Sequence, residues 1–246
     1  MATSTGVRYS NGKEDTDGRS KFIWEYPVPT NAFWNDLPFT LGRNFLSNYS
    51  EEEIQSLPID GDSTLPKEKK LELLHKLLKE GLTAKDNAAA PQTFYDVDYP
   101  AWDRLYLGIV SIQQELSLPE AEKTLRMMCE LRTDRSNLSH FHNLAGLLLA
   151  KGEFHEAETM EKEVKVWLES KLGKDSPQAF GAGRIIVEAT WRQGGQRRGD
   201  AERLLEEMRG LVEGMGGGDF GVYQEDERGY LQKLDERLRS EDIIEA

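Results

Sequence analysis

After Ser50, apolar side chains recur at intervals of three and four residues along most of the chain. This spacing places them on one face of a helix. Ser50 and Glu53 match the capping box that begins a helix, because each side chain can bind the other residue's backbone N–H. The pattern therefore predicts a helical protein from Ser50 onward.

A longer helix is predicted to follow, with Pro66 near its first turn and Gly81 at its end. Leu71, Leu74 and Leu78 share one face of it. The segment from Thr83 to Thr93 contains alanine, asparagine and proline, and is predicted to be a linker.

Between Tyr99 and Gly216 the pattern of helix, tight turn, helix occurs three times. The second helices share an anchor alanine, at Ala121, Ala157 and Ala201, which lie 36 and 44 residues apart. Small residues also occupy the first helices, at Gly108, Ala145 and Ala189. We expect the two helices of each pair to cross closely at these small residues, because bulky side chains would hold them apart.

The segment from Asp219 to Leu238 is predicted to be one further amphipathic helix, with one apolar and one charged face. Such a helix suits the end of a repeat stack. The preceding run Gly216-Gly217-Gly218 lacks the Lys-Ser/Thr of a phosphate loop, so it is interpreted as a helix stop.

Residues 21–50 form an aromatic arm that holds eight of the chain's 22 aromatic residues. Pro27, Pro29 and Pro38 predict a mostly non-helical segment. Aromatic side chains bury large areas, so the arm is expected to pack on other parts of the chain. We favour an irregular N-terminal cap that replaces a missing repeat. Two alternatives place the arm over a binding groove or make it the wall of a small-molecule pocket. The aromatic residues of the arm are Phe22, Trp24, Tyr26, Phe33, Trp34, Phe39, Phe45 and Tyr49.

Composition narrows the function. The chain has 31 Lys+Arg against 44 Asp+Glu, a net charge of −13, which lacks the basic footprint of nucleic-acid or anionic-membrane binding. The longest apolar run, Leu144 to Ala150, is far shorter than the roughly 20 residues of a spanning helix. We therefore expect neither nucleic acid nor a membrane as a partner.

Residues 1–20 are polar and rich in Gly, Ser and Asp, so a disordered tail is expected rather than a secretory signal. The single cysteine, Cys129, excludes an intrachain disulfide and is expected to be a buried small hydrophobe. These features predict a protein of the cytoplasm, with the nucleus as the alternative, and not a secreted one.

The second repeat resembles a tetratricopeptide repeat, in particular the long form found in kinesin light chains. It contains Asn143-Leu144-Ala145, then Gly152-Glu153-Phe154-His155-Glu156-Ala157-Glu158. Its second helix closes with Leu172-Gly173-Lys174-Asp175-Ser176-Pro177, which matches the family's Leu-Gly-x-Asp-x-Pro turn. The first and third repeats are degenerate, and the resemblance covers roughly half the chain, from Tyr99 to about Gly216.

The resemblance implies a right-handed stack of helix pairs whose first helices line a concave groove for a peptide or protein segment. One subtype of the family grips a C-terminal carboxylate with a Lys/Arg/Asn clamp. Here only Asn143 matches the clamp, because Leu105 and Ile109 occupy two other clamp positions, so an apolar or mixed groove is expected. The groove positions implied by the resemblance are Tyr106, Ile109, Gln113, His142, Asn143, Gly146, Leu149, Arg184 and Gln193.

Residues able to do chemistry are interpreted mainly as structural. His140 and His142 are two positions apart on a helix, so they face different ways and cannot share a metal. The run of charges around Glu161 and Lys165 is interpreted as a solvated helix face. The basic cluster of Arg192, Arg197, Arg198 and Arg203 is interpreted as paired with nearby acids, with an acidic-partner patch as the alternative.

Together these observations predict an all-α protein: a short right-handed α-solenoid of about three helix pairs with a capping helix and an irregular N-terminal region. We expect a non-enzymatic adaptor without cofactor or metal, which binds a peptide or protein segment. The alternative is a small-molecule-binding protein or enzyme with a pocket between the arm and the first repeat. The predicted parts are a tail (1–20), the arm with one or two helices (21–93), the repeats (94–218) and the capping helix with the C-terminal end (219–246).

Overall fold

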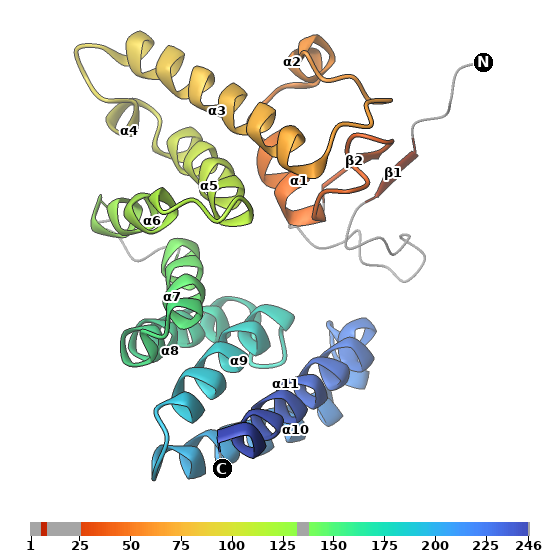
Figure 1. Cartoon of the computed structure of the whole chain (residues 1–246), viewed down its shortest axis with the longest axis vertical. Coiled ribbons are helices and arrows are strands. Elements are labelled where there is room, and N and C mark those ends of the chain that lie inside the picture. The colour runs from red at the N-terminus through yellow and green to blue at the C-terminus, as the bar shows by residue number, and fades with distance from the viewer. Residues whose placement is uncertain (1–5, 9–25, 132–137, 246) are drawn as a thin grey trace. The chain divides into compact units, whose positions relative to one another are not determined.

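The computed structural model describes residues 6–8, 26–131 and 138–245, with side chains from 26 to 131 and from 138 to 240. They belong to two compact units, Met1–Met128 and Cys129–Ala246, and each unit is considered by itself. The structure is almost wholly helical, which confirms the all-α class (Figure 1). The exception within the described ranges is an antiparallel pair of short strands, β1 (Gly6–Arg8) and β2 (Val28–Thr30). β1 lies in the expected disordered tail, so these three residues depart from that prediction; the rest of 1–20 lies outside the described residues.

The described part of the aromatic arm packs within the first unit. Phe33, Trp34 and Phe45 are at most 3% exposed. Their rings form a chain with centroids 5.1 and 5.8 Å apart. The arm also contains helix α1 (Phe39–Leu46), which begins after Pro38 and packs against helix α5 (Tyr99–Glu115). Most described residues of the arm lie outside helices, as its prolines predicted. The one helix there is compatible with Pro38, which stands just before it and leaves its hydrogen bonds intact.

Lys70 ties the arm to helix α3 (Lys67–Ala89). Its Nζ donates to the backbone oxygen of Ala32 and to Oδ2 of Asp36, both at 2.7 Å. The Lys70 side chain is completely buried, and its ammonium lies 5.6 Å from the centre of the Phe33 ring. A buried ammonium is costly unless it is fully paired, so these contacts hold the arm in one position on α3.

Two helix predictions in this unit have different outcomes. The capping box is confirmed: helix α2 (Glu51–Ser56) begins with reciprocal hydrogen bonds between Ser50 and Glu53. The predicted end of the next helix at Gly81 is wrong, because α3 continues through the expected linker to Ala89. A glycine inside a helix reduces helix stability by only about 1 kcal/mol relative to alanine. The helix-favouring residues that follow Gly81 offset this loss. Pro91 is the residue that disfavours further helix.

Gly108 of α5 contacts a different partner from the one predicted. A Cβ atom there would lie 3.0 Å from the backbone oxygen of Asn44 on α1 and 3.0 Å from a methyl group of Leu78 on α3. The small size of Gly108 therefore allows α1 and α3 to approach α5 closely. It does not serve the crossing with Ala121 that the sequence predicted. The remaining helices of the first unit are α4 (Phe94–Val97) and α6 (Glu120–Leu131), whose last residues belong to the second unit.

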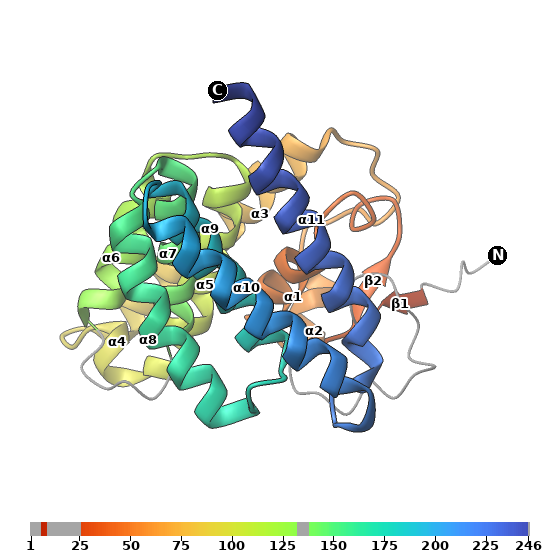
Figure 2. The ribbon, with the colours of Figure 1, turned by 90° about the horizontal axis from the view of Figure 1, so that it is seen from below.

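The second unit consists of consecutive helices joined by short turns. Each packs against the next, and in addition α7 packs against α9 and α9 against α11. We refer to these three as the α7–α9–α11 layer; Figure 2 shows the helices of this unit from below. Gly152 takes φ +85° at the turn after α7, a conformation that glycine adopts without strain. The helices are α7 (Ser139–Lys151), α8 (Phe154–Leu172), α9 (Pro177–Arg192), α10 (Arg197–Gly214) and α11 (Gln224–Glu245), with short 3₁₀ turns η2 (Met215–Gly217) and η3 (Gly221–Tyr223) before α11.

The small residues of the second and third predicted pairs are all buried. Ala145, Ala157, Ala189 and Ala201 are at most 1% exposed. Between α9 and α10, a Cβ atom on Gly183 would lie 2.7 Å from the end of the Met208 side chain. The Met208 side chain therefore packs directly over Gly183, and a larger residue at position 183 would have to displace it.

Candidate functional site

The layer of α7, α9 and α11 carries six of the nine predicted groove residues. On α7, His142, Asn143, Gly146 and Leu149 are all half-buried. Gly146 faces α9, since a Cβ atom there would lie 3.9 Å from Cδ1 of Ile185. These four residues thus share a partly exposed stretch of α7 next to α9.

His142 contacts a buried carboxylate on α8. Its Nδ1 lies 2.6 Å from Oε1 of Glu161, whose side chain is 0% exposed, whereas the imidazole is 37% exposed. When Glu161 is ionised it can only accept, so Nδ1–H donates to it and Nε2 is the ring atom left for a ligand. Nε2 accepts a hydrogen bond in the neutral ring and donates one in the protonated ring.

The prediction that the charges around Glu161 form a solvated helix face is wrong for Glu161 itself, which is completely buried. Burial raises its pKa, and the hydrogen bond from His142 opposes that rise only in part. Its second oxygen, Oε2, is buried without a hydrogen-bond partner among the described residues. The sequence contained a usable signal: Ala157, Glu161, Val164 and Leu168 follow helical spacing, so Glu161 lies within the apolar stripe.

Arg184 of α9 is held by α11. Its guanidinium forms an ion pair with Glu227, which is 3% exposed, and lies 4.9 Å from the centre of the Tyr230 ring. Burial raises the pKa of Glu227, and Arg184 lowers it in part. Arg184 therefore joins two helices of the layer, and its side chain is only 25% exposed.

Gln193 contributes to a second buried carboxylate site. Its Nε2 donates to Oε2 of Glu158 at 2.6 Å, and Lys162 and Arg197 donate to Oε1 of the same group. Burial opposes ionisation of Glu158, but these three donors outweigh it and lower its pKa to about 2. The pairing interpretation of the basic cluster fits the observed contacts: Arg192 pairs with Glu188, and Arg197 and Arg203 pair with Asp200.

The other three predicted groove residues lie on α5, in the first unit. Ile109 and Gln113 are only 3% and 6% exposed, so neither is presented to a ligand in this structure. Tyr106 is half-buried, and its ring packs at a tilt against Trp102, with ring centroids 4.6 Å apart. It belongs to an aromatic row with Tyr95 and Tyr99.

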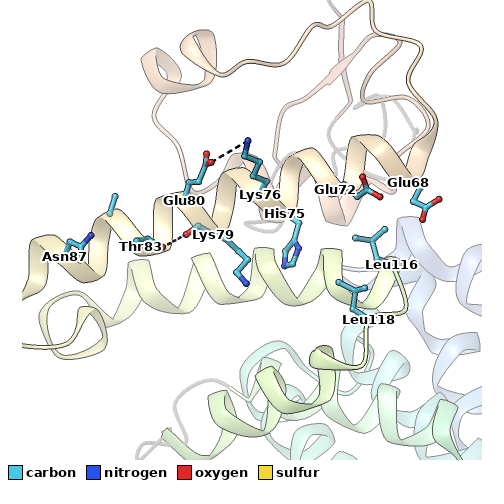
Figure 3. A pocket seen from close by; sticks show the side chains of 11 residues that line it. Glu68, Glu72, His75, Lys76, Lys79, Glu80, Thr83, Asn87, Leu116 and Leu118 are labelled. Atoms are coloured by element: carbon cyan, nitrogen blue, oxygen red, sulfur yellow. Dashed lines mark hydrogen bonds and ion pairs between the residues drawn. The ribbon is translucent and has the colours of Figure 1, made fainter.

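Sequence reasoning missed an open groove in the first unit, along α3 (Figure 3). Its volume is about 830 Å³. One wall is a stripe of α3 side chains, and the other is the turn after α5, with Leu116 and Leu118. His75 points from α3 toward α5 (Figure 3), and its Nε2 is buried without a hydrogen-bond partner among the described residues. The α3 residues of the groove are Glu68, Glu72, His75, Lys76, Lys79, Glu80, Thr83, Ala84 and Asn87.

Two hollows among the described residues are formed outside the aromatic arm. A second hollow, of about 350 Å³, is lined by residues of α7 and α8, and arm residues line neither of the two hollows. In the described ranges, no three His, Cys, Asp or Glu side chains are grouped to hold a metal ion. His140 is completely buried, whereas Cys129 is half-exposed rather than buried as predicted.

Comparison with known proteins adds no relative: no protein-family model, no curated protein and no solved structure matches this chain. Within the described residues, no helix has both the length and the apolar character needed to cross a bilayer.

Proposed function

We propose that the second unit is a protein-interaction module that binds a peptide or protein segment on the α7–α9–α11 layer. In this proposal α7 to α10 are two tetratricopeptide-like pairs of a short right-handed solenoid, and α11 is its cap. The resemblance of Asn143-Leu144-Ala145 and of the Leu172 to Pro177 turn to that family supports the assignment. The partner would be a protein of the cytoplasm or nucleus.

The observation that carries the proposal is the surface of α7. His142, Asn143 and Leu149 place an imidazole, an amide and an apolar side chain on one half-exposed surface. Recognition of a peptide segment needs such a combination of apolar contact and a few fixed polar groups. Glu161 orients the imidazole from below, so less rotamer entropy is lost on binding.

Site-specific photo-crosslinking tests this face. A benzoylphenylalanine residue in place of Leu149 is expected to crosslink a defined partner segment in cells, identified by mass spectrometry. The same residue in place of Val166, which is 68% exposed on α8, is the matched control. Crosslinks of the same partner from both positions, or none from position 149, would contradict the proposal.

The expected crosslink should also depend on the polar anchor. Replacing His142 with Ala is expected to weaken the crosslink from position 149 several-fold, whereas replacing the exposed His155 with Ala leaves it unchanged. An equal effect of the two substitutions would show that the imidazole of His142 has no specific role.

A further inference from the structure

A second interaction surface lies in the groove along α3. We propose that this groove binds one amphipathic helix of a partner protein, antiparallel to α3, with acidic residues in its first turns and basic residues in its last turns. This surface is separate from the α7–α9–α11 layer and does not rest on the function proposed for that layer.

The shape of the groove suits a helix. Its α3 residues run from Glu68 to Asn87, which in a helix is about 28 Å of length. Leu116 and Leu118 are half-exposed at the end of the groove near Glu68 and Glu72 (Figure 3), and Ala84 is exposed toward its other end, so the groove offers apolar contact at both ends. An amphipathic helix recognises such a groove with side chains at helical spacing.

The charges along the groove give the partner a direction. Glu68 and Glu72 lie at one end, and Lys76 and Lys79 lie near the middle. Glu68 and Lys79, about 16 Å apart along the helix, are both exposed and have no ion-pair partner among the described residues. The other charges are already engaged, Glu72 with Lys69 and Lys76 with Glu80.

A helix that binds antiparallel to α3 can pair with both charges while keeping the charge distribution that stabilises a helix. Its N-terminal turns would lie by Lys79 and its C-terminal turns by Glu68. Helices are stabilised by acids in the first turn and by bases in the last turn, because of the macrodipole. The same arrangement of charges would therefore stabilise the partner helix and pair it with the groove.

His75 also lines the groove. Its Nε2 is buried and has no hydrogen-bond partner among the described residues, and burial together with Lys79 lowers its pKa while Glu120 opposes this. Glu72 and Lys79, one turn away on α3, and Glu120 at the start of α6 are the charged groups near it.

Two synthetic helical peptides of the same composition test the proposal on the full chain. The acid-first peptide carries Glu in its first turn and Arg eleven residues later, with leucines between them on one face; the base-first peptide exchanges Glu and Arg. By fluorescence anisotropy, the acid-first peptide is expected to bind about 3- to 10-fold more tightly, because in the antiparallel orientation it forms two exposed ion pairs where the base-first peptide places like charges together.

The double variant Glu68→Lys and Lys79→Glu is expected to reverse this preference. The matched control, Glu207→Lys with Lys174→Glu, changes exposed residues outside the groove and should leave the preference unchanged. Leu149→Arg, on the other surface, should also have no effect, so this experiment fails or succeeds independently of the function proposed for the α7–α9–α11 layer.

Equal binding of the two peptides, or no binding, would overturn the proposal, as would an unchanged preference in the Glu68/Lys79 variant. So would sedimentation of the wild type as a dimer that this variant dissociates, since the occupant would then be a second copy of the chain.

Discussion

Two carboxylates three residues apart on α8 show how much a side chain's immediate partners decide. Glu158 and Glu161 are both buried, yet their pKa values shift in opposite directions. Glu158 accepts hydrogen bonds from three side chains, two of them cationic. Among the described residues, Glu161 has a hydrogen bond with His142 alone. The effect of desolvation on the pKa is therefore larger at Glu161, and the effect of hydrogen bonding is larger at Glu158.

The lowered pKa of Glu158 predicts a dependence of stability on pH. A carboxylate with a folded pKa of about 2 stabilises the fold above its unfolded pKa of about 4.3, and this stabilisation is lost as the pH falls from there toward 2. Replacing Glu158 with Gln should therefore lower the melting temperature at pH 6 and have progressively less effect toward pH 2.

Thermal denaturation monitored by circular dichroism between pH 2 and pH 7 checks this. Glu207→Gln, at an exposed position of the same unit, is the control and should change little at any pH. A difference between wild type and Glu158→Gln that stays constant with pH would show that the carboxylate charge does not stabilise the fold.

At the scale of the element, helix ends followed local rules wherever the local signal was strong. Ser50 caps α2 as predicted, and Ser176 caps α9 with Pro177 in its first turn. Gly81 did not end α3, because a single interior glycine is a weak signal against many helix-favouring neighbours. Helix α1 was missed because its burial against α5 lies outside any local window.

Helix packing in the second unit makes Ala157 sensitive to size. It is 0% exposed, so replacing it with Leu should reduce the free energy of unfolding by about 1–3 kcal/mol through overpacking. Urea denaturation measures the change. Ala150→Leu, at an exposed position of α7, is the control and should stay within about 0.5 kcal/mol of the wild type. An unchanged midpoint for Ala157→Leu would argue against close packing there.

At the scale of the molecule, each unit has apolar residues packed among themselves. In the second unit, Leu138, Val164, Leu168, Ala179 and Ala182 form one buried cluster. Helix α11 adds the buried leucines 231, 234 and 238, which are at most 5% exposed. A unit with its own core can fold alone.

We therefore expect residues 138–246 to unfold cooperatively as an isolated fragment. Residues 138–214, which lack α11, should be less stable by roughly 5 kcal/mol, because three buried leucines lose their place in the core. Urea denaturation followed by circular dichroism compares the two fragments. A gradual transition for residues 138–246 would contradict the independence of this core. Equal midpoints for the two fragments would contradict the stabilising role of α11.

Local sequence rules located most helices, because periodicity and capping depend on neighbours within a few positions. The half-exposed residues of α7 were implied by the resemblance to tetratricopeptide repeats. Local rules did not locate the partners of the predicted groove residues: Glu161 below His142, or Glu227 and Tyr230 at Arg184. The α3 groove was missed for a related reason. Its walls, α3 and the turn at Leu116 and Leu118, are about 30 residues or more apart in the chain.

The sequence alone determined the helical class and the burial of the anchor alanines Ala121, Ala157 and Ala201. Helical spacing and small side-chain size are properties of a short stretch of sequence, so they can be recognised without knowing the packing. Only the tertiary structure showed which helices approach Gly108 closely. It also decided that α3 extends to Ala89 and that the Glu161 carboxylate is removed from solvent. These outcomes depend on contacts between segments far apart in the chain, whose energies no local pattern records.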